Sequence, residues 1–484
     1  MNFQQWLDTF LNFEKLPQKN IFWLDMMESL AQIFGNPEGF APCVHVAGSK
    51  GKGSVSRMIS SILSEAGLKT GLYSSPHILS FYERITQNGN FFPDEIYEKC
   101  ADELRGAIDS ALNSAEEGAE FPLPKGRSVT WFEIVTIYAF LCFRAAKVDA
   151  SVLEVGLGGK LDATNIVRPK ISVINTIELE HTEFLGDTIE KIAAEKAGII
   201  KEKTPVLCAS CKDSVREVFQ KKAREMDAPI FFSDDLLEDL KFSYEQSECD
   251  GGEFFMTTEF SSRIFSRPIK AKMRLLGEVQ AKNAFLAAAA VRIAFPKISE
   301  AQIERGLEKA SLRARFETMP FPKCENLEEN GEKRFFVLDG AHTAQSIRGT
   351  LETFDSIFGK NGIANACGKK SGKIPAHLLF ACAADKDIER IAKLLKKACF
   401  QKITLTSLNG AKKSDPKKCA EAFEKEGIEF AFEENIENAL ESALKFAAKE
   451  NAVLLATGSF YLAAEILENL TRRKSARKST RSQS

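Results

Sequence analysis

Lys52 and Ser54 are the residues whose types and spacing most clearly suggest chemistry. They lie in a segment that contains three glycines: Gly48, Gly51 and Gly53. The apolar run 44–47 predicts a buried strand before this segment, and the apolar spacing of 55–63 predicts a helix after it. A strand, a glycine loop and a helix together present backbone N–H groups and a helix N-terminus to phosphate. We expect Lys52 to reach the terminal phosphates of a nucleotide and Ser54 to contact Mg²⁺.

The segment departs from the usual phosphate-binding loop (P-loop) pattern at two positions. That pattern has Gly six residues before the lysine, where this chain has Val46, and Ser or Thr directly after it, where this chain has Gly53. Glycine and lysine in a polar loop can also form a plain turn. The position between a buried strand and an amphipathic helix favours phosphate binding.

Ser75, Glu154 and His181 each follow or end another predicted strand. Pro76 keeps Ser75 out of a helix, Glu154 lies beside a glycine turn, and His181 is on a loop. In an open parallel sheet, ligands bind at the carboxyl ends of the strands. A carboxylate there holds Mg²⁺ in P-loop enzymes. The alternatives are an isolated charge for Glu154 and a structural role for His181.

The order of strands and helices predicts an α/β fold with two units. The first is a P-loop-containing, mostly parallel, doubly wound sheet domain, with an antiparallel excursion over 241–276 that turns at 250–252. The second is a smaller Rossmann-like α/β domain that begins near residue 313. We expect domains at 1–311 and 312–470. We expect 471–484 to be a disordered tail, because it has six basic residues and no acidic one.

Composition excludes several classes of protein. A net charge of -2 gives no general attraction to nucleic acid or to anionic membranes, and no aromatic residues are interleaved with the basic tail. Residues 1–10 lack the order of a signal peptide, and the apolar run 134–143 is too short to span a bilayer. The eleven cysteines include one CxxC, at 208–211, and no second pair to complete a zinc site. We expect reduced thiols in a cytoplasmic protein.

A series of short motifs runs along the chain. These are 35–37 (Gly-Asn-Pro), 45–54, 73–77 (Tyr-Ser-Ser-Pro-His), 83–85 (Glu-Arg-Ile), 130–133, 154–159, 161–165, 181–186, 195–199 (Glu-Lys-Ala-Gly-Ile), 315–317 (Arg-Phe-Glu), 339–342 (Asp-Gly-Ala-His), 385–387 and 457–459. In their order and spacing, from about residue 20 to 470, they resemble the folylpolyglutamate synthase/dihydrofolate synthase family of the Mur ligase superfamily.

The resemblance implies roles for the matching residues. The ATP-binding set is Gly48, Gly51, Lys52, Gly53, Ser54, Asn283, Arg315 and Asp339. The metal ligands are Ser75, Glu154 and His181. The folate or pteroate pocket contains Arg84, Thr130, Trp131, Phe132, Glu133, Leu161, Asp162 and Ala163. The residues implied in catalysis are Lys52, Lys196 and His342. Lys196 matches a lysine that is carbamylated in relatives, and the resemblance implies two Mg²⁺ ions.

The implied activity is ATP-dependent addition of L-glutamate to a folate or to dihydropteroate through an acyl phosphate. A monomer that binds only small molecules is expected. Two other functions remain open: a Mur-type ligase acting on a muramyl-peptide precursor, and an ATP-binding switch that ligates nothing.

The chain also departs from the family pattern. Ser49-Lys50 replaces the usual Thr-Asn, Glu180 replaces Asp before His181, and Arg313-Ala314 replaces Pro-Gly before Arg315. The family's Leu-Gly-Leu-x-Arg segment, part of the dihydropteroate pocket, has no clear counterpart around Leu24.

Overall fold

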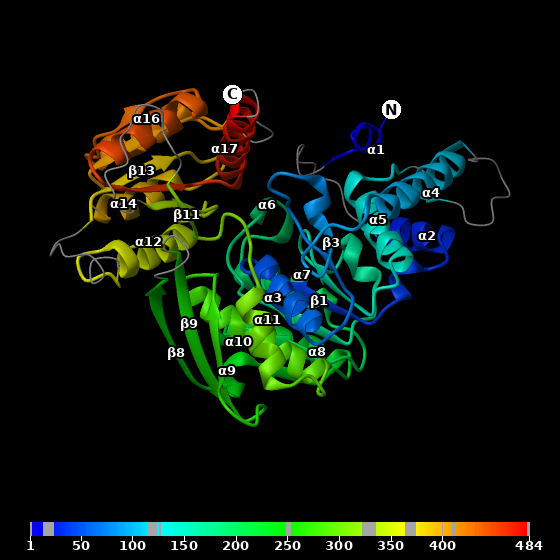
Figure 1. Cartoon of the computed structure of the whole chain (residues 1–484). Helices are drawn as coiled ribbons and strands as arrows, with labels where there is room; N and C mark the ends of the chain where they lie inside the picture. The colour runs from blue at the N-terminus through cyan, green and yellow to red at the C-terminus, as the bar shows by residue number, and fades with distance from the viewer. Residues whose placement is uncertain are drawn as a thin grey trace. The chain divides into compact units, whose positions relative to one another are not determined.

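The computed structural model describes residues 2–12, 24–113, 123–124, 127–247, 253–321, 335–363, 374–398, 400–408 and 413–481. These residues divide into two compact units (Figure 1). Unit 1 consists of 1–240, 259–271 and 282–310, and unit 2 consists of 241–258, 272–281 and 311–484.

Unit 1 contains a seven-stranded sheet with the order β3-β2-β4-β1-β5-β6-β7. Every neighbouring pair is parallel except β2 and β3, which are antiparallel. The strands are β1 (Cys43–Ala47), β2 (Thr70–Tyr73), β3 (Ile85–Gln87), β4 (Ala150–Glu154), β5 (Ile171–Ile174), β6 (Val206–Cys208) and β7 (Ile230–Phe232). This confirms the mostly parallel sheet predicted from the sequence.

Helices cover both faces of this sheet. Cys43 and Ala47 lie on one face of β1. Cys43 belongs to an apolar cluster that includes residues of α5 (Trp131–Ala145). Ala47 belongs to a second cluster, with residues of α7 (Ile189–Lys196) and α8 (Asp213–Glu225). Val44 and Val46 point to the opposite face, because side chains alternate along a strand. The helices of unit 1 are α1 (Phe3–Leu7), α2 (Asp25–Ile33), α3 (Lys52–Glu65), α4 (Asp94–Asn113), α5 (Trp131–Ala145), α6 (Thr182–Leu185), α7 (Ile189–Lys196), α8 (Asp213–Glu225), α9 (Ser233–Leu236) and α11 (Glu300–Lys309).

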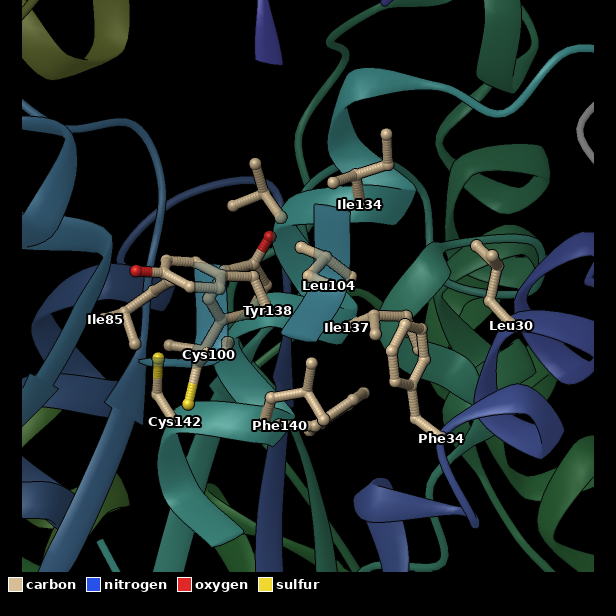
Figure 2. Close-up of a cluster of buried hydrophobic side chains, with 14 of the residues drawn as sticks. Leu30, Phe34, Ile85, Cys100, Leu104, Ile134, Ile137, Tyr138, Phe140 and Cys142 are labelled. Atoms are coloured by element: carbon tan, nitrogen blue, oxygen red, sulfur yellow. The ribbon is translucent and has the colours of Figure 1, made fainter. Parts of the chain in front are cut away.

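An extensive apolar cluster of unit 1 surrounds α5. Figure 2 shows side chains of α5, including Ile137 and Tyr138, among Leu30 of α2, Ile85 of β3 and Leu104 of α4. All five are buried. Removing this much apolar surface from water anchors α2 and α4 to the sheet through α5.

Unit 2 contains a six-stranded sheet with the order β11-β12-β16-β13-β14-β15. Only β11 and β12 are antiparallel. The strands are β11 (Glu317–Pro320), β12 (Phe335–Leu338), β13 (Ala376–Phe380), β14 (Lys402–Leu405), β15 (Ala431–Phe432) and β16 (Val453–Thr457). The helices are α12 (Ala344–Phe358), α14 (Ile388–Lys397), α15 (Pro416–Lys425), α16 (Ile436–Lys449) and α17 (Phe460–Arg481). This is the Rossmann-like domain predicted from the sequence.

A three-stranded sheet, β10-β9-β8, corresponds to the predicted excursion over 241–276. Its strands are β8 (Leu237–Gln246), β9 (Phe254–Ser262) and β10 (Ile269–Met273), and helix α10 (Glu278–Ala294) follows. Residues of these strands and of α10 are divided between the two units. The predicted turn at 250–252 lies outside the described residues.

The C-terminal segment differs from the sequence prediction. Helix α17 continues through Arg481, so residues 471–481 are helical where we expected a disordered tail. Lys and Arg have good helix propensity, and the segment continues a helix that begins at Phe460, so no new nucleation is required. Among the helices of the described residues, none has the length and apolar content needed to cross a membrane.

Candidate active site

The P-loop connects β1 to α3 in unit 1. Gly51 precedes the helix with a φ of 73°, and Gly48 has a φ of 148°. These left-handed conformations favour glycine over other residues. Helix α3 begins at Lys52, whose Nζ donates a hydrogen bond to the carbonyl oxygen of Gly48 at 2.8 Å. The lysine is therefore folded over its own loop, at the N-terminal end of a helix suited to binding an anion.

The side-chain amides of two buried asparagines pack against Gly51 of the loop. Asn175 Nδ2 donates to Asn283 Oδ1 at 2.9 Å, and both residues are almost fully buried. A Cβ at Gly51 would lie 2.4 Å from Asn175 Nδ2 and 3.0 Å from Asn283 Oδ1. Gly51 is thus required by close packing as well as by φ. Sequence reasoning missed Asn175, although it follows β5 at the same sheet edge as the other candidates.

Glu154 and Ser75 meet beside the P-loop. The backbone N–H of Ser75 donates to Glu154 Oε2 at 3.1 Å, because β2 and β4 are parallel neighbours. A Cβ at Gly53 would be 3.5 Å from both carboxylate oxygens of Glu154. A carboxylate and a hydroxyl beside a phosphate loop are the oxygen donors that Mg²⁺ prefers, so these two residues fit the implied ion.

His181 occupies a different setting. It precedes the short helix α6 with a φ of 46°, and its side chain is exposed. In the part of the chain that the structure describes, no three His, Cys, Asp or Glu side chains are grouped as a metal site. The structure therefore joins Glu154 to Ser75 and provides no comparable grouping around His181.

Lys196 is buried at the end of α7, where its Nζ lies 3.0 Å from Glu180 Oε1. Lys50 Nζ lies 3.9 Å from Glu180 Oε2. Burial by itself would raise the pKa of Glu180, but the charges of Lys52, Lys196 and Lys50 hold the pKa below its ordinary value. Burial, and then the charge of Lys52, lower the pKa of Lys196 to about 8. Sequence reasoning noted Glu180 only as a departure from the family and assigned it no role.

Asp162 holds the glycine turn that follows β4. Its Oδ2 accepts hydrogen bonds from the N–H groups of Gly156 at 3.0 Å and Leu157 at 2.9 Å. Its Oδ1 accepts from the N–H and hydroxyl of Thr164. The neighbouring Leu161 is half-buried and Ala163 is buried. Both carboxylate oxygens of Asp162 thus accept hydrogen bonds from backbone N–H groups around the end of β4.

The predicted pocket residues on α5 lie beside Arg84. The guanidinium of Arg84 is 4.9 Å from the ring centroid of Trp131, and its Nε donates to His77 Nδ1 at 2.8 Å. Thr130 and Glu133 form a capping box at the start of α5. Phe132 packs against Gly156, where a Cβ would lie only 2.4 Å from the ring. The structure brings Arg84 and Trp131 together, and Thr130 and Glu133 fix the start of the helix that carries Trp131 and Phe132.

In unit 2, Asp339 links two predicted site residues. Its Oδ2 accepts a hydrogen bond from the N–H of Phe316, next to Arg315, at 2.8 Å. Its Oδ1 accepts from the N–H of Ala341 at 3.0 Å, next to His342. Asp339 follows β12, so the end of one strand fixes the backbone beside both Arg315 and His342.

Comparisons with known proteins identify this combination of domains. A family model described as "Mur ligase middle domain" matches residues 111–291, and one described as "Mur ligase, glutamate ligase domain" matches 324–460. A Bacillus subtilis protein named "Dihydrofolate synthase/folylpolyglutamate synthase" is 30% identical over 456 residues, covering 92% of this chain and 94% of the relative.

Solved structures of folylpolyglutamate synthases match the fold of this chain over almost its whole length. The crystal structure of folylpolyglutamate synthase from Thermotoga maritima has a TM-score of 0.73 and 27% identity, and the match covers 97% of this chain and 96% of that one. Escherichia coli FolC in complex with DHPP and ADP has a TM-score of 0.73 and 25% identity, covering 98% of this chain and 99% of that one.

The two α/β units and the P-loop site define an ATP-dependent ligase of the Mur type. Within that class, the chain belongs to the dihydrofolate synthase/folylpolyglutamate synthase family. The resemblance seen in its motifs, the fold class and the ligase activity expected from them are confirmed.

Proposed function

We propose that this chain joins L-glutamate to a folate and to dihydropteroate, using ATP to activate the acceptor carboxylate. The observation that carries the proposal is the P-loop in unit 1, with Lys52 over Gly48 and Glu154 beside Gly53, in a chain of this family. The relatives' names include both activities, and FolC was solved with DHPP and ADP.

The chemistry follows from the low reactivity of a carboxylate toward amines. A carboxylate oxygen of the acceptor attacks the γ-phosphorus of ATP, ADP leaves, and an acyl phosphate forms. The glutamate amine then attacks the acyl carbon, phosphate leaves, and the amine loses a proton. Lys52 and the N–H groups of the loop stabilise the charge on the transferring phosphoryl group. In this proposal Arg315, Asp339 and His342 of unit 2 bind the nucleotide, and Asn283 supports the P-loop.

Ser75, Glu154 and His181 are the proposed Mg²⁺ ligands. When bound, the ion neutralises phosphate charge during transfer. We further propose that Lys196 becomes a carbamate, which would give it a carboxylate suited to a second Mg²⁺. The pKa of about 8 supports this, because carbamylation requires the neutral amine.

We assign the pterin side of the acceptor to the region around Trp131 and Arg84. The buried guanidinium of Arg84 lies over the indole ring of Trp131, so hydrogen-bond donors lie beside an aromatic ring, a combination that suits an aromatic ring system with hydrogen-bonding edges. In the proposal, the pocket is lined by Phe132, Leu161 and Ala163. The hydrogen bonds of Thr130, Glu133 and Asp162 fix the backbone around it.

We propose that residues 1–311 bind ATP and the acceptor, and that 312–470 form the glutamate-ligase domain. We also propose a cytoplasmic monomer. The seven cysteines in the described residues are all free thiols, which supports a reducing compartment. Light scattering should give a mass near the 53.7 kDa of one chain, and a doubled mass would contradict the monomer.

The test measures phosphate release with ATP, with and without L-glutamate, using dihydropteroate and tetrahydrofolate in separate reactions. We expect glutamate-dependent release with each acceptor, and loss of it in Lys52→Ala. The matched control is Lys69→Ala, outside the loop. Equal rates with and without glutamate would instead indicate an ATP-binding switch. Glutamate-dependent release with tetrahydrofolate but not with dihydropteroate would refute the dihydrofolate synthase part of the proposal.

A further inference from the structure

Phe460 contacts three residues around the predicted nucleotide-binding side chains of unit 2. It is the first residue of α17 and directly follows the Thr457-Gly458-Ser459 segment at the end of β16. The guanidinium carbon of Arg315 lies 4.0 Å from the centroid of its ring. The imidazole of His342 lies 5.7 Å from the same centroid, with the two planes at 64°.

Gly340 allows this close packing. A Cβ on Gly340 would lie 2.1 Å from Cε1 of Phe460, a separation that no side chain could accept. The ring therefore rests directly on the backbone of the Asp339-Gly340-Ala341-His342 turn. His342 Nδ1 also lies 2.8 Å from the carbonyl oxygen of Gly340, so the ring, the glycine and the imidazole form one packed group.

The backbone around Arg315 is already fixed without Phe460. Ala314 and Phe316, on either side, have φ values of 53° and 46°. Asp339 accepts the N–H of Phe316, and the N–H of Gly340 donates to the carbonyl oxygen of Ala314 at 2.9 Å. Sparsely populated conformations of this kind persist only where the surroundings hold them. The backbone is thus set by contacts that do not involve Phe460, and the ring of Phe460 supports the side chain of Arg315.

An aromatic face is suited to that support. It attracts a guanidinium through the ring quadrupole without using the N–H donors at the edge of the guanidinium plane. Those donors are the groups that bind phosphate in pairs. A carboxylate in the same place would occupy them and cancel the positive charge.

We propose that Phe460 is a positioning residue for the ligase reaction: its ring holds Arg315 and His342 in the orientations in which they bind ATP. This inference rests on the proposed roles of Arg315 and His342. Phe460 itself touches neither substrate nor reacting atoms in this proposal. Its effect is exerted through the guanidinium and the imidazole.

The test compares Phe460→Leu, which keeps an apolar side chain without a ring, with Phe460→Tyr, which keeps the aromatic face. We expect Phe460→Leu to raise the KM for ATP by about 3- to 10-fold, the range of a lost cation–π contact. The KM for L-glutamate should stay unchanged, and kcat should change less than the KM for ATP. Phe460→Tyr should restore the KM for ATP to near its wild-type value. Calorimetric titration with ADP should show the same order of affinities.

The control is Phe354→Leu, which removes a buried ring from the same unit where its aromatic contacts are Phe358 and Phe400. Both Leu variants should lower the thermal midpoint, and only Phe460→Leu should change the KM for ATP. A similar change in both variants, or a Phe460→Tyr variant no better than Phe460→Leu, would overturn the proposal.

Arg315→Ala separates this inference from the proposed function. An unchanged KM for ATP in Arg315→Ala would refute the proposed nucleotide role of Arg315. If Arg315→Ala raises that KM, Phe460→Leu should add less in the Arg315→Ala background than in the wild type, because only the effect through His342 remains. Full additivity of the two changes would refute the positioning role and leave the nucleotide role intact.

Discussion

The ammonium of Lys196 lies 3.0 Å from a carboxylate oxygen of Glu180, and the Lys196 side chain is only 2% exposed. The other oxygen of Glu180 faces Lys50 of the P-loop, at 3.9 Å. Lys50 and Glu180 both differ from the residues usual in the family, so two departures from the family pattern meet in one ion pair. Glu180 therefore links the phosphate loop to the lysine on α7.

The first prediction concerns Lys196. Lys196→Ala should lower the ligase rate by about 100-fold or more, because a charged group beside the phosphate loop is lost. If Lys196 acts as a carbamate, short carboxylates such as formate should restore part of the rate by entering the space it leaves. The measurement is ADP release with and without added formate.

Methylammonium serves as the opposite additive in the same assay. Rescue by methylammonium and not by formate would show that Lys196 acts as the cation paired with Glu180. Lys191→Ala, on the exposed side of the same helix, is the control and should keep wild-type activity.

The second prediction concerns Asp162. In Asp162→Asn, an amide NH₂ replaces one of the oxygens that accept from Gly156, Leu157 and Thr164, so buried N–H donors lose their acceptor. The free energy of unfolding should fall by about 1–3 kcal/mol. Chemical denaturation measures this loss. Asp149→Asn, which removes an exposed acceptor for the N–H of Lys69, should have a smaller effect. An equal decrease in the free energy of unfolding in the two variants would show that the buried hydrogen bonds of Asp162 contribute no more to stability than the exposed one of Asp149.

The sequence predicted the parts of the site that local patterns encode. Gly51 and Lys52 could be placed at a strand-to-helix turn because apolar runs mark both flanking elements. Glu154 could be placed at the same edge because it ends a buried strand. These predictions depend only on side-chain periodicity and on the rule that parallel strands end together.

The remaining parts depend on contacts between distant segments. Asn175 and Asn283 are 108 positions apart in the sequence, and their side chains form a hydrogen bond beside Gly51. No local sequence pattern indicates this contact. The pairing of Glu180 with Lys196 depends on how a loop after β5 folds back on α7. The helix over 471–481 was missed because charge suggested disorder, whereas continuation from the packed start of α17 does not require a favourable sequence of its own.

The third prediction concerns pH. Burial lowers the pKa of His45 to about 3, and its Nε2 lies 2.8 Å from the hydroxyl of Thr164. In the unfolded chain this histidine has an ordinary pKa near 6.5, so between pH 6.5 and 3 the unfolded state binds more protons. The stability that His45 contributes is fully present above pH 6.5 and is lost as pH falls toward 3. At pH 5 the loss from this one group should be about 2 kcal/mol.

Denaturant unfolding at pH 7.5 and pH 5.0 tests this in the wild type and in His45→Gln. The variant should be less stable at pH 7.5 but should lose less stability on acidification. An exposed group, as in Lys69→Gln, should leave the pH dependence unchanged. An identical pH dependence in His45→Gln and the wild type would contradict the prediction.

The fourth prediction concerns Ala314, which occupies a position where the family usually has glycine. Its φ of 53° is left-handed, a conformation that disfavours residues with a Cβ by about 1–2 kcal/mol. Ala314→Gly relieves that strain but loses a buried methyl group and gains chain entropy in the unfolded state, so the unfolding free energy should change by less than about 1 kcal/mol. Ala439→Gly, at an equally buried helical position of the same unit, has no strain to relieve and should destabilise by about 1–2 kcal/mol. Thermal unfolding of the two variants gives the comparison. Equal destabilisation would mean that the left-handed backbone at Ala314 stores little strain, and that Asp339 holds Phe316 and the Arg315 turn at almost no conformational cost.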